Sequence, residues 1–538
     1  MKINKLKIDL KFKIKNFKLN LFWVFLLVVG YFLTRLINLT VIPVFCDEAI
    51  YIRWAQVMRA VQSLRFLPLS DGKQPLFMWL MIPFLKIFSD PLVAGRMVSV
   101  LAGLGTMAGV YILSYLLFEK KEISLFASLL YLITPFTLFF DRMALADGLL
   151  SMLGIWFLIF AVLLAQNLRL DLAMIGGIIL GLGLITKSPA LFFALMLPLC
   201  LLVKDGCHCE GFIPEAILKK ATGKEIASSR HTLGLAMTLI RMTVLSGVVY
   251  LFAFAIYNIL RLGPEFHLIA LRNKDYVFSL NEIIKHPLNP FLGNFKDAIS
   301  WFWILLTPPV FILGILGMVL MLYKNIKNSA LLLIWFLVPL LAQSAVAKVF
   351  TSRYVLFSVP IFLVFCAFAL LVVFKSLKNK ILTTVVLTIL FVFPLFQIMQ
   401  LVINPQKAWL PANERSGYLE RWTAGYGIRE SADYLKQISK TQKVLVGTEG
   451  YFGTLPDGLQ IYLEKVPNVT VIGVGYPIKE IPEKLINGLV DNRVFLLVND
   501  TRFEVKRDEK LKLITQYPKA KNQKIDSREN LLLFEIEK

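Results

Sequence analysis

The sequence predicts a polytopic α-helical membrane protein that carries a soluble α/β domain at its carboxyl end. Of its 538 residues, 57% are hydrophobic and only 17% are charged, and its mean hydropathy is +0.67. Soluble domains usually contain about 25% charged residues. Apolar runs long enough to cross a bilayer recur from Leu21 to Val402, and charged residues become frequent after Asn404. This change predicts a transmembrane part, residues 1–402, followed by a soluble part, residues 403–538.

About eleven apolar runs are expected to span the membrane. Two of them are short and are separated only by Lys187 and its neighbours, so they could instead form one kinked or re-entrant element. The expected spans are 21–38, 92–118, 123–140, 143–165, 172–186, 189–203, 234–261, 302–323, 329–347, 354–374 and 381–402.

The lysines and arginines predict the orientation in the plasma membrane, because cytoplasmic loops are enriched in them. The segment before the first span is rich in lysine, which places the amino terminus in the cytoplasm. An odd number of spans then places residues 403–538 and the long loop 39–91 outside the cytoplasm. The basic residues of the expected inner loops are Lys120, Lys121, Arg169, Lys204, Lys219, Lys220, Lys224, Arg230, Lys324, Lys327, Lys375, Lys378 and Lys380.

The net charge of +22 fits this topology better than it fits nucleic-acid binding. Lysines beside membrane spans face anionic lipid headgroups, and no stretch interleaves aromatic and basic residues as RNA-binding modules do. Cys207, His208 and Cys209 are adjacent in an expected inner loop, so they cannot all close around one zinc ion. No metal site is predicted from them.

The expected outer segments carry most of the polar chemistry. Lysine and arginine at a membrane boundary are more often simple anchors, and Arg142 could form a structural pair with Asp147. A buried carboxylate is costly without a partner or a function, so the acids are the stronger candidates. The segment 262–301 is long and charged enough to act as a mobile cover. The candidate residues on these segments are Asp47, Glu48, Arg53, Lys73, Arg142, Asp147, Arg353 and Tyr354.

The carboxyl-terminal part alternates strand-like and helical patterns, which predicts an α/β domain with a partly parallel sheet. Gly447–Gly453 follows the first strand and could resemble a phosphate loop, but no lysine follows it, and a glycine-rich turn is favoured. The expected strands are 443–446, 469–474, 494–498 and 531–536, and the expected helices are 428–439, 455–464 and 479–488.

Five short motifs occur one after another within residues 20–365. They are Phe45-Cys-Asp-Glu-Ala-Ile-Tyr51 with Trp54-Ala-Gln56, Gly72-Lys-Gln-Pro-Leu-Phe-Met-Trp79, Asp141-Arg-Met-Ala-Leu-Ala-Asp147, Gly183-Leu-Ile-Thr-Lys-Ser-Pro189 and Arg353-Tyr-Val-Leu-Phe-Ser-Val-Pro360. This ordered set resembles the membrane glycosyltransferases of the GT-C class. More narrowly, it resembles the branch that contains protein O-mannosyltransferases and the lipid A aminoarabinose transferase.

The chain departs from that family at identifiable places. Gln74 separates the lysine from the proline that usually follows it directly. Ile50 stands near the position where the aminoarabinose enzyme has an arginine, so Arg53 is only a substitute candidate. The second spaced aspartate of the metal-binding GT-C enzymes is missing after Asp47, so a divalent metal is possible but is not expected to be obligatory.

The resemblance implies a sugar donor on a polyprenyl phosphate, a protein, lipid or glycan acceptor, and inversion at the anomeric carbon. It assigns Asp47 as the general base and Glu48 as the residue that orients the acceptor or Asp47. The resemblance also implies cations beside the leaving phosphate and polar groups around the sugar or acceptor. The cations are Lys73, Arg353, Arg142 and Arg53, and the polar groups are Asp147 and Tyr354.

Two other functional classes also use polytopic membrane proteins or lipid-anchored domains. A transporter or lipid flippase would place binding groups near the bilayer midplane in paired repeats, whereas the acids here gather at one surface and no matching halves are detected. A non-catalytic adaptor would use the soluble domain to bind partners. Activity on a polyprenyl-phosphate sugar would separate the enzyme from both.

Overall fold

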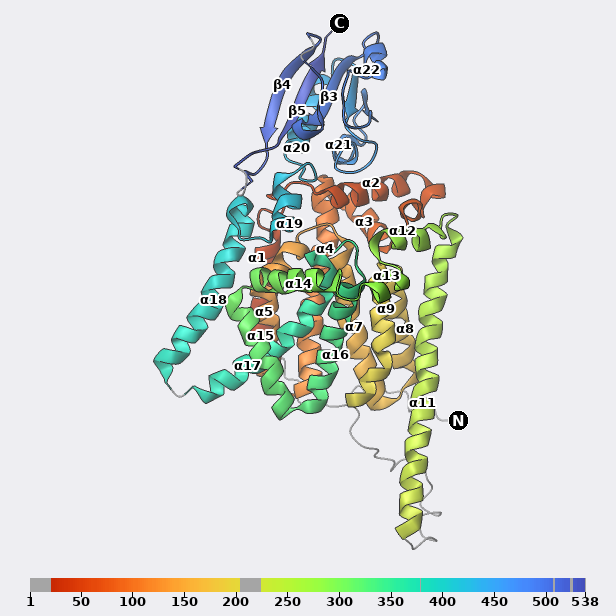
Figure 1. Ribbon diagram of the computed structural model, residues 1–538, viewed down its shortest axis with the longest axis vertical. Helices are drawn as coiled ribbons and strands as arrows, with labels where there is room; N and C mark the ends of the chain where they lie inside the picture. The colour runs from red at the N-terminus through yellow and green to blue at the C-terminus, as the bar shows by residue number, and fades with distance from the viewer. Residues whose placement is uncertain (1–20, 204–223, 378, 507–508, 523–525, 538) are drawn as a thin grey trace.

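The computed structural model describes residues 21–203, 224–377, 379–506, 509–522 and 526–537 (Figure 1). Its helices form an upright bundle, and a five-stranded sheet covers one end of that bundle. We call this end the sheet end and the opposite end the distal end. The expected inner-loop residues Lys204, Lys219 and Lys220 and the segment Cys207–Cys209 lie outside the described residues, as do the amino-terminal lysines.

The helices make the chain an integral membrane protein, because six of those described are long and apolar enough to cross a bilayer. Two sharply bent pairs raise this number to eight if each pair is one span. Four of the six are α4 (Pro91–Phe118), α7 (Ala146–Asn167), α16 (Ile326–Val346) and α18 (Lys380–Ile403). The other two are Ile240–Leu262, formed by most of α11 (Lys224–Tyr257) and the following η6 (Asn258–Leu262), and Ser352–Ser376, formed by η7 (Ser352–Ser358) and α17 (Val359–Ser376). The bent pairs are α5 (Lys121–Ile133) with α6 (Pro135–Asp141), and α14 (Phe291–Leu305) with α15 (Pro308–Lys324).

The expected number of eleven spans is not confirmed among the described residues. The apolar helices α1 (Leu21–Leu36) and α8 (Leu170–Leu184) have 16 and 15 residues, which makes each only about 22–24 Å long. Residues 188–203 form the short pieces η4 (Ser188–Ala190), α9 (Leu191–Met196) and η5 (Leu197–Val203). The span expected at 302–323 is broken, since α14 and α15 meet at 115° around Thr307, directly before two prolines.

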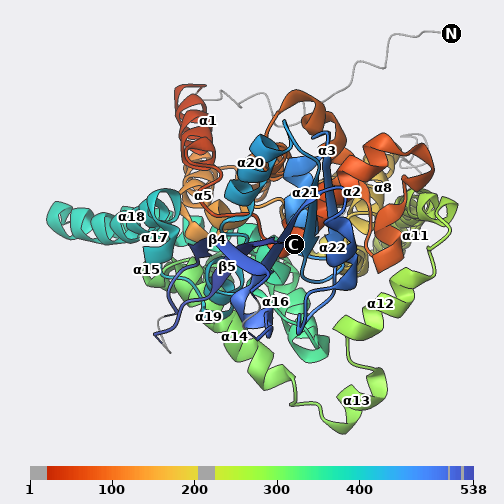
Figure 2. The ribbon, with the colours of Figure 1, turned by 90° about the horizontal axis from the view of Figure 1, so that it is seen from above.

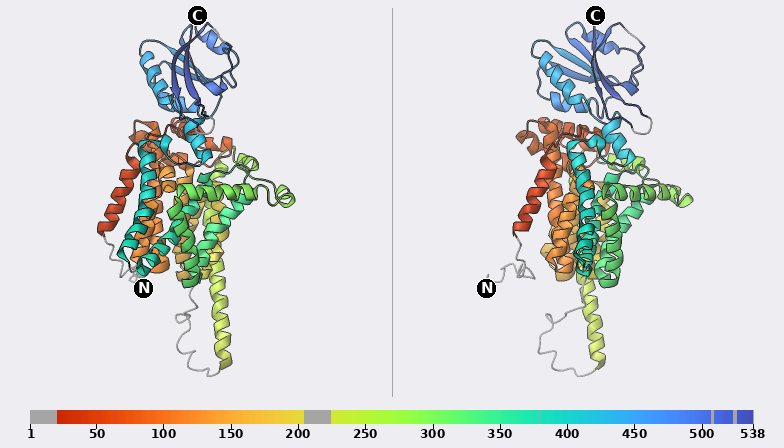
Figure 3. Two further views of the ribbon diagram at one scale, coloured as in Figure 1. Left: turned by 60° about the vertical axis from the view of Figure 1, so that its left-hand side comes forward. Right: turned by 90° about the vertical axis from the view of Figure 1, so that its left-hand side faces the viewer.

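The segments expected on opposite sides of the membrane separate to opposite ends of the bundle (Figure 3). The carboxyl ends of α4, α7 and α15 lie at the distal end, and Lys120, Arg169 and Lys324 are at or directly after these helix ends in the sequence (Figure 1). The helices of the expected outer segments lie at the sheet end, where α12 and α13 extend at the rim (Figure 2). These helices are α2 (Cys46–Ala60), α3 (Leu76–Ile87), α12 (Leu268–Tyr276) and α13 (Leu280–Lys285), with η7 (Ser352–Ser358) nearby.

The carboxyl-terminal part contains a mixed sheet with the strand order β2-β1-β3-β5-β4. β1 is parallel to β2 and β3, whereas β5 is antiparallel to β3 and β4, so the predicted partly parallel sheet is confirmed. The strands are β1 (Val444–Thr448), β2 (Val469–Gly473), β3 (Arg493–Asn499), β4 (Leu511–Pro518) and β5 (Asn530–Ile536). The helices are α20 (Ile428–Ile438), α21 (Asp457–Leu463) and α22 (Glu483–Gly488), close to their predicted positions. The sequence did not predict β4, an edge strand with no fully buried residue.

The sheet part is fixed to α2 and to the loop that precedes it. Phe45 forms an isolated bridge with Ala424, and the Gln56 side-chain amide donates to the carbonyl oxygen of Ile461 at 3.0 Å. Arg59 also forms an ion pair with Glu464. A single hydrophobic cluster includes side chains of both the bundle and the sheet. The helix that carries Asp47 is therefore held by the sheet part on one side and by the helical bundle on the other.

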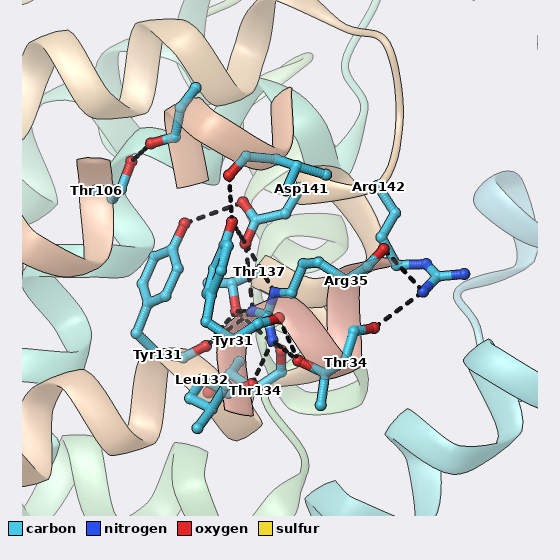
Figure 4. A network of polar contacts seen from close by, with 12 residues as sticks. Tyr31, Thr34, Arg35, Thr106, Tyr131, Leu132, Thr134, Thr137, Asp141 and Arg142 are labelled. Carbon is cyan, nitrogen blue, oxygen red and sulfur yellow. Dashed lines mark hydrogen bonds and ion pairs between the residues drawn. The ribbon is translucent and has the colours of Figure 1, made fainter. Parts of the chain in front are cut away.

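A buried polar network fixes the bend between α5 and α6 (Figure 4). Pro135 has no N–H to donate to the carbonyl oxygen of Tyr131, four residues earlier. The Thr137 hydroxyl donates to this oxygen at 2.6 Å, and Arg35 donates to it at 3.3 Å and to the next carbonyl oxygen at 2.6 Å. Side chains thus replace the helical hydrogen bonds that the bend removes.

The same network fixes the turn that leads into α7. The Asp141 carboxylate accepts hydrogen bonds from Arg35 and from the hydroxyls of Tyr31 and Tyr131. Next to it, Arg142 donates to backbone carbonyl oxygens at the end of α1, including that of Ile37 at 2.7 Å. These contacts hold the start of α7, where Asp147 lies.

Candidate active site

Asp47 lies between two cations contributed by distant segments. Its carboxylate is 2.6 Å from the Arg353 guanidinium and 3.7 Å from the Lys73 ammonium. Asp47 is in the first turn of α2, Lys73 follows a short 3₁₀ helix at 67–71, and Arg353 is in η7. All three side chains are between 14% and 20% exposed, so each keeps a path to solvent or ligand.

Lys73 is held in place by a close approach of α12. Gly72 has φ +64°, and a Cβ atom at this position would lie 2.4 Å from the Cβ of Arg272. Only glycine fits here without displacing α12. Arg272 pairs with Asp71 at 3.4 Å, and Lys73 pairs with the same carboxylate at 3.2 Å. The segment expected as a cover therefore packs directly beside Lys73.

A second acid–base pair adjoins the first. Lys187, in the turn after α8, bonds to the carboxylate of Asp147 at 2.5 Å. The ammonium of Lys187 lies 4.3 Å from the centre of the Tyr354 ring, whose neighbour is Arg353. The two pairs thus form one cluster, which we call the charged cluster: Asp47, Lys73, Asp147, Lys187, Arg353 and Tyr354.

The charged cluster shifts the titration of Asp47. Burial opposes its ionisation, but the attraction of Arg353 and Lys73 outweighs burial and lowers the pKa of Asp47 to about 2. The pKa of Lys73 is raised despite burial, through Tyr51, Asp47 and Asp71. Burial lowers the pKa of Lys187, and Asp147 counteracts this only in part. Asp47 is therefore ionised at neutral pH.

Aromatic side chains surround the cluster. The Lys73 ammonium lies 5.3 Å from the ring centre of Tyr51 and 5.6 Å from that of Trp54, both on α2. Phe45 and Tyr418 stack with ring centres 4.2 Å apart, and the Arg353 guanidinium lies 5.8 Å from the Phe45 ring. Such rings exclude water while leaving the cations attracted to their faces.

Three predicted site residues are not brought to the cluster. Glu48 is fully buried and forms an ion pair with Arg96 at 2.7 Å, because adjacent residues of a helix point about 100° apart. The guanidinium of Arg142 donates its hydrogen bonds to backbone carbonyl oxygens of residues 34–38. Arg53 is about 240° around α2 from Asp47, and it donates to the side-chain oxygen of Gln56 on the same helix. The Arg142–Asp147 pair considered from the sequence is replaced by Lys187–Asp147.

Two members of the site were missed. Lys187 lies inside the motif 183–189, where a charge between two short apolar runs indicates only a boundary between spans. Tyr418 lies beyond the last span, and nothing in the local sequence indicates that it returns to Phe45. Among the described residues, no three His, Cys, Asp or Glu side chains lie close enough to hold a metal ion together.

The Glu48–Arg96 pair is expected to be essential for stability. Arg96 also donates to the carbonyl oxygens of Leu39 and Ile42, and Glu48 accepts from the N–H of Ala144 at 2.6 Å. Glu48→Gln leaves the Arg96 charge buried without compensation, which should cost about 3–5 kcal/mol. The measurement is thermal unfolding of the purified protein in detergent. Glu122→Gln, at an exposed position of the distal end, is the control; equal melting of the two variants would contradict this role.

The fold and the site together define a membrane-embedded protein with the fold of the GT-C class of glycosyltransferases. ArnT from Cupriavidus metallidurans bound to undecaprenyl phosphate has this fold, with a TM-score of 0.50, 14% identity, and coverage of 95% of this chain and 97% of that chain. AglB, the archaeal oligosaccharyltransferase from Archaeoglobus fulgidus in complex with an inhibitory peptide and a dolichol-phosphate, is 13% identical, with a TM-score of 0.46 over 90% of this chain and 70% of that chain.

A narrower relationship covers part of the chain. Residues 72–210 match the family model described as dolichyl-phosphate-mannose-protein mannosyltransferase. This match includes Lys73, Asp147 and Lys187 but not Asp47 or Arg353. No protein of curated function matches the sequence.

Proposed function

We propose that this chain is a glycosyltransferase that moves a sugar from a polyprenyl-phosphate donor to an acceptor hydroxyl, with inversion at the anomeric carbon. The observation that carries the proposal is Asp47, an ionised carboxylate that lies between Arg353 and Lys73 and remains partly accessible. A carboxylate within reach of a hydroxyl can act as its general base. Cations beside it can stabilise the charge on a leaving phosphate.

The proposed reaction is a single displacement. The acceptor oxygen loses its proton to Asp47 and forms a bond to the anomeric carbon, on the face opposite the phosphate. The bond between that carbon and the phosphate oxygen breaks, and the lipid phosphate leaves with the electron pair. We assign the leaving phosphate to Lys73 and Arg353, and the sugar or acceptor to Asp147, Lys187 and Tyr354. Glu48 and Arg142 position the surrounding backbone.

Donor binding also makes Asp47 a better base. In the free protein its pKa is about 2, which is too low for efficient proton transfer near neutrality. A phosphate anion between Arg353 and Lys73 would offset their attraction for the Asp47 carboxylate. The proton affinity of Asp47 should therefore rise when the donor is in place.

The proposal is tested with the purified protein in lipid nanodiscs and a panel of polyprenyl-phosphate hexoses and pentoses. We expect release of polyprenyl phosphate, slow with water alone and faster with an acceptor. The alternative function, transport of a lipid or a sugar, predicts that the protein in closed proteoliposomes moves intact donor across the bilayer without release of phosphate. That second result would overturn the proposal.

The proposed topology places the amino terminus in the cytoplasm and residues 403–538, as a separate domain, outside the plasma membrane. Its support is that the helix ends followed by basic residues lie at the distal end, whereas α2 and η7, which carry Asp47 and Arg353, lie at the sheet end. A reporter active only in the cytoplasm, fused after Lys538, should therefore be silent, whereas the same reporter inserted after Lys324 should be active. The opposite pattern would reverse the orientation.

A further inference from the structure

The sheet part contains a second polar cavity that the proposed reaction does not use. Its volume is about 410 Å³, within the range of about 300–1,000 Å³ that is typical of small-molecule sites. It is lined by Glu420, Arg421, Trp422, Tyr476, Thr501, Arg502, Ala520, Asn522, Ser527 and Glu529. We call it the sheet pocket.

The sheet pocket lies at the carboxyl ends of two parallel strands. Tyr476 follows β2, and Thr501 and Arg502 follow β3. In open α/β sheets, ligands bind outside the carboxyl ends of the strands. The same end of the sheet faces the bundle, since the ring of Phe452, after β1, packs against that of Trp54 of α2 with the ring centres 5.7 Å apart. The sheet pocket is therefore on the same side of the molecule as the charged cluster.

A short stretch of chain connects the two sites. Tyr418 stacks on Phe45 beside the charged cluster, and Trp422, four residues later, lines the sheet pocket. The stretch between them is fixed at both ends, because Glu420 pairs with Arg415 at 2.7 Å and Lys519 donates to the carbonyl oxygen of Arg421 at 3.0 Å. A ligand in the sheet pocket would therefore have a fixed position relative to Asp47.

The aromatic side of the sheet pocket packs against a guanidinium and is partly exposed. The guanidinium of Arg502 lies 3.6 Å from the ring centre of Trp422 and 4.3 Å from that of Tyr476. Arg502 also forms an ion pair with the buried carboxylate of Glu449, at a distance of 3.7 Å. Tyr476 is nevertheless 62% exposed, so much of this ring is free to contact a ligand. An exposed ring held in one orientation suits the flat C–H face of a pyranose.

The polar side of the sheet pocket suits a ligand that carries hydroxyl groups and no net charge. Its lining contains two carboxylates, Glu420 and Glu529, and two guanidiniums, Arg421 and Arg502, which balance. The amide of Asn522 and the hydroxyls of Thr501 and Ser527 complete the lining. Carboxylates accept hydrogen bonds, guanidiniums donate them, and amides and hydroxyls do both. This mixture matches vicinal hydroxyl groups, each of which is both donor and acceptor.

We propose that the sheet pocket binds a neutral saccharide, and that this saccharide is part of the acceptor, which makes the acceptor a glycan. The second half of this proposal rests on the proposed glycosyltransferase function, whereas the first half does not. Bound there, the glycan places one of its hydroxyl groups toward Asp47, and the sheet part determines which glycan is used.

The binding test uses the full chain in nanodiscs free of glycoside detergents, because a maltoside headgroup would compete. Saturation-transfer NMR is recorded with the methyl glycosides of mannose, glucose, galactose and N-acetylglucosamine, with mannitol as an acyclic polyol and a neutral tetrapeptide as further probes. We expect at least one glycoside to bind, with affinity reduced about tenfold by Tyr476→Ala. Tyr476→Phe keeps the ring and should keep most of the binding. Lys512→Ala, an exposed substitution on β4, should change nothing.

The outcomes separate the sheet pocket from the proposed reaction. Asp47→Asn should bind the glycoside normally, and Tyr476→Ala should hydrolyse donor normally in water while its KM for a glycan acceptor rises. If no glycoside binds, or if only the peptide binds in a Tyr476-dependent manner, the sheet-pocket proposal is overturned although the transferase remains. Glycoside binding without any release of polyprenyl phosphate would leave the saccharide site standing and remove its role for the acceptor.

Discussion

Asp47→Asn should slow sugar transfer by about a hundred- to ten-thousandfold, the usual contribution of general base catalysis. The substitution keeps the shape of the side chain and removes its affinity for a proton. Donor binding should not weaken, because Arg353 and Lys73 lose a competing anion and remain available to the phosphate. The measurement is turnover and donor affinity on equal amounts of monodisperse protein.

Two further measurements make this result specific to Asp47. Asp275→Asn removes a carboxylate that is 62% exposed and pairs with Arg272, and it should leave turnover nearly unchanged. In the wild-type protein, the acidic limb of kcat should lie at higher pH than that of kcat/KM, because bound phosphate raises the pKa of Asp47 from its free value of about 2. Near-normal turnover in Asp47→Asn would end its role as the base and direct attention to Asp147.

Arg353→Ala should lower both donor affinity and turnover, with a loss of about a hundred- to a thousandfold in kcat. The phosphate is charged before and after the bond breaks, so a cation beside it acts on both states. Arg353→Lys keeps the charge but loses the planar fork and should recover only part of the activity. Lys73→Ala should have a smaller effect in the same direction, since Lys73 shares its charge with Asp71.

The control for Arg353 is Arg429→Ala. Arg429 lies in the sheet part, and its guanidinium is 50% exposed and pairs with Asp90. This variant should retain donor affinity. A thermal unfolding curve is recorded for each variant, since Asp47 loses its nearest partner in Arg353→Ala. An equal loss of donor affinity in Arg429→Ala and Arg353→Ala would show a general effect of surface charge and contradict a phosphate site at Arg353.

The sequence by itself determined the class of the protein and the approximate positions of the long apolar helices and of four strands. Hydrophobicity and its period are local properties, so the apolar runs identified the long helices, and the alternation after Asn404 identified four of the five strands. The ordered motifs also identified Asp47, Lys73, Asp147 and Arg353, which the fold brings into one cluster. An acidic residue without a partner is energetically costly in a membrane, so its presence in the sequence already indicates a function or a partner.

Only the tertiary structure decided which side chain meets which. Asp47 and Glu48 are adjacent in sequence, but the turn of α2 sends one toward Arg353 and the other toward Arg96. Lys187 is a partner of Asp147 because the turn after α8 reaches the start of α7, and Tyr418 joins the site because residues 403–538 fold back onto Phe45. These pairings depend on the faces that distant helices present to one another, and no local pattern of residues encodes them.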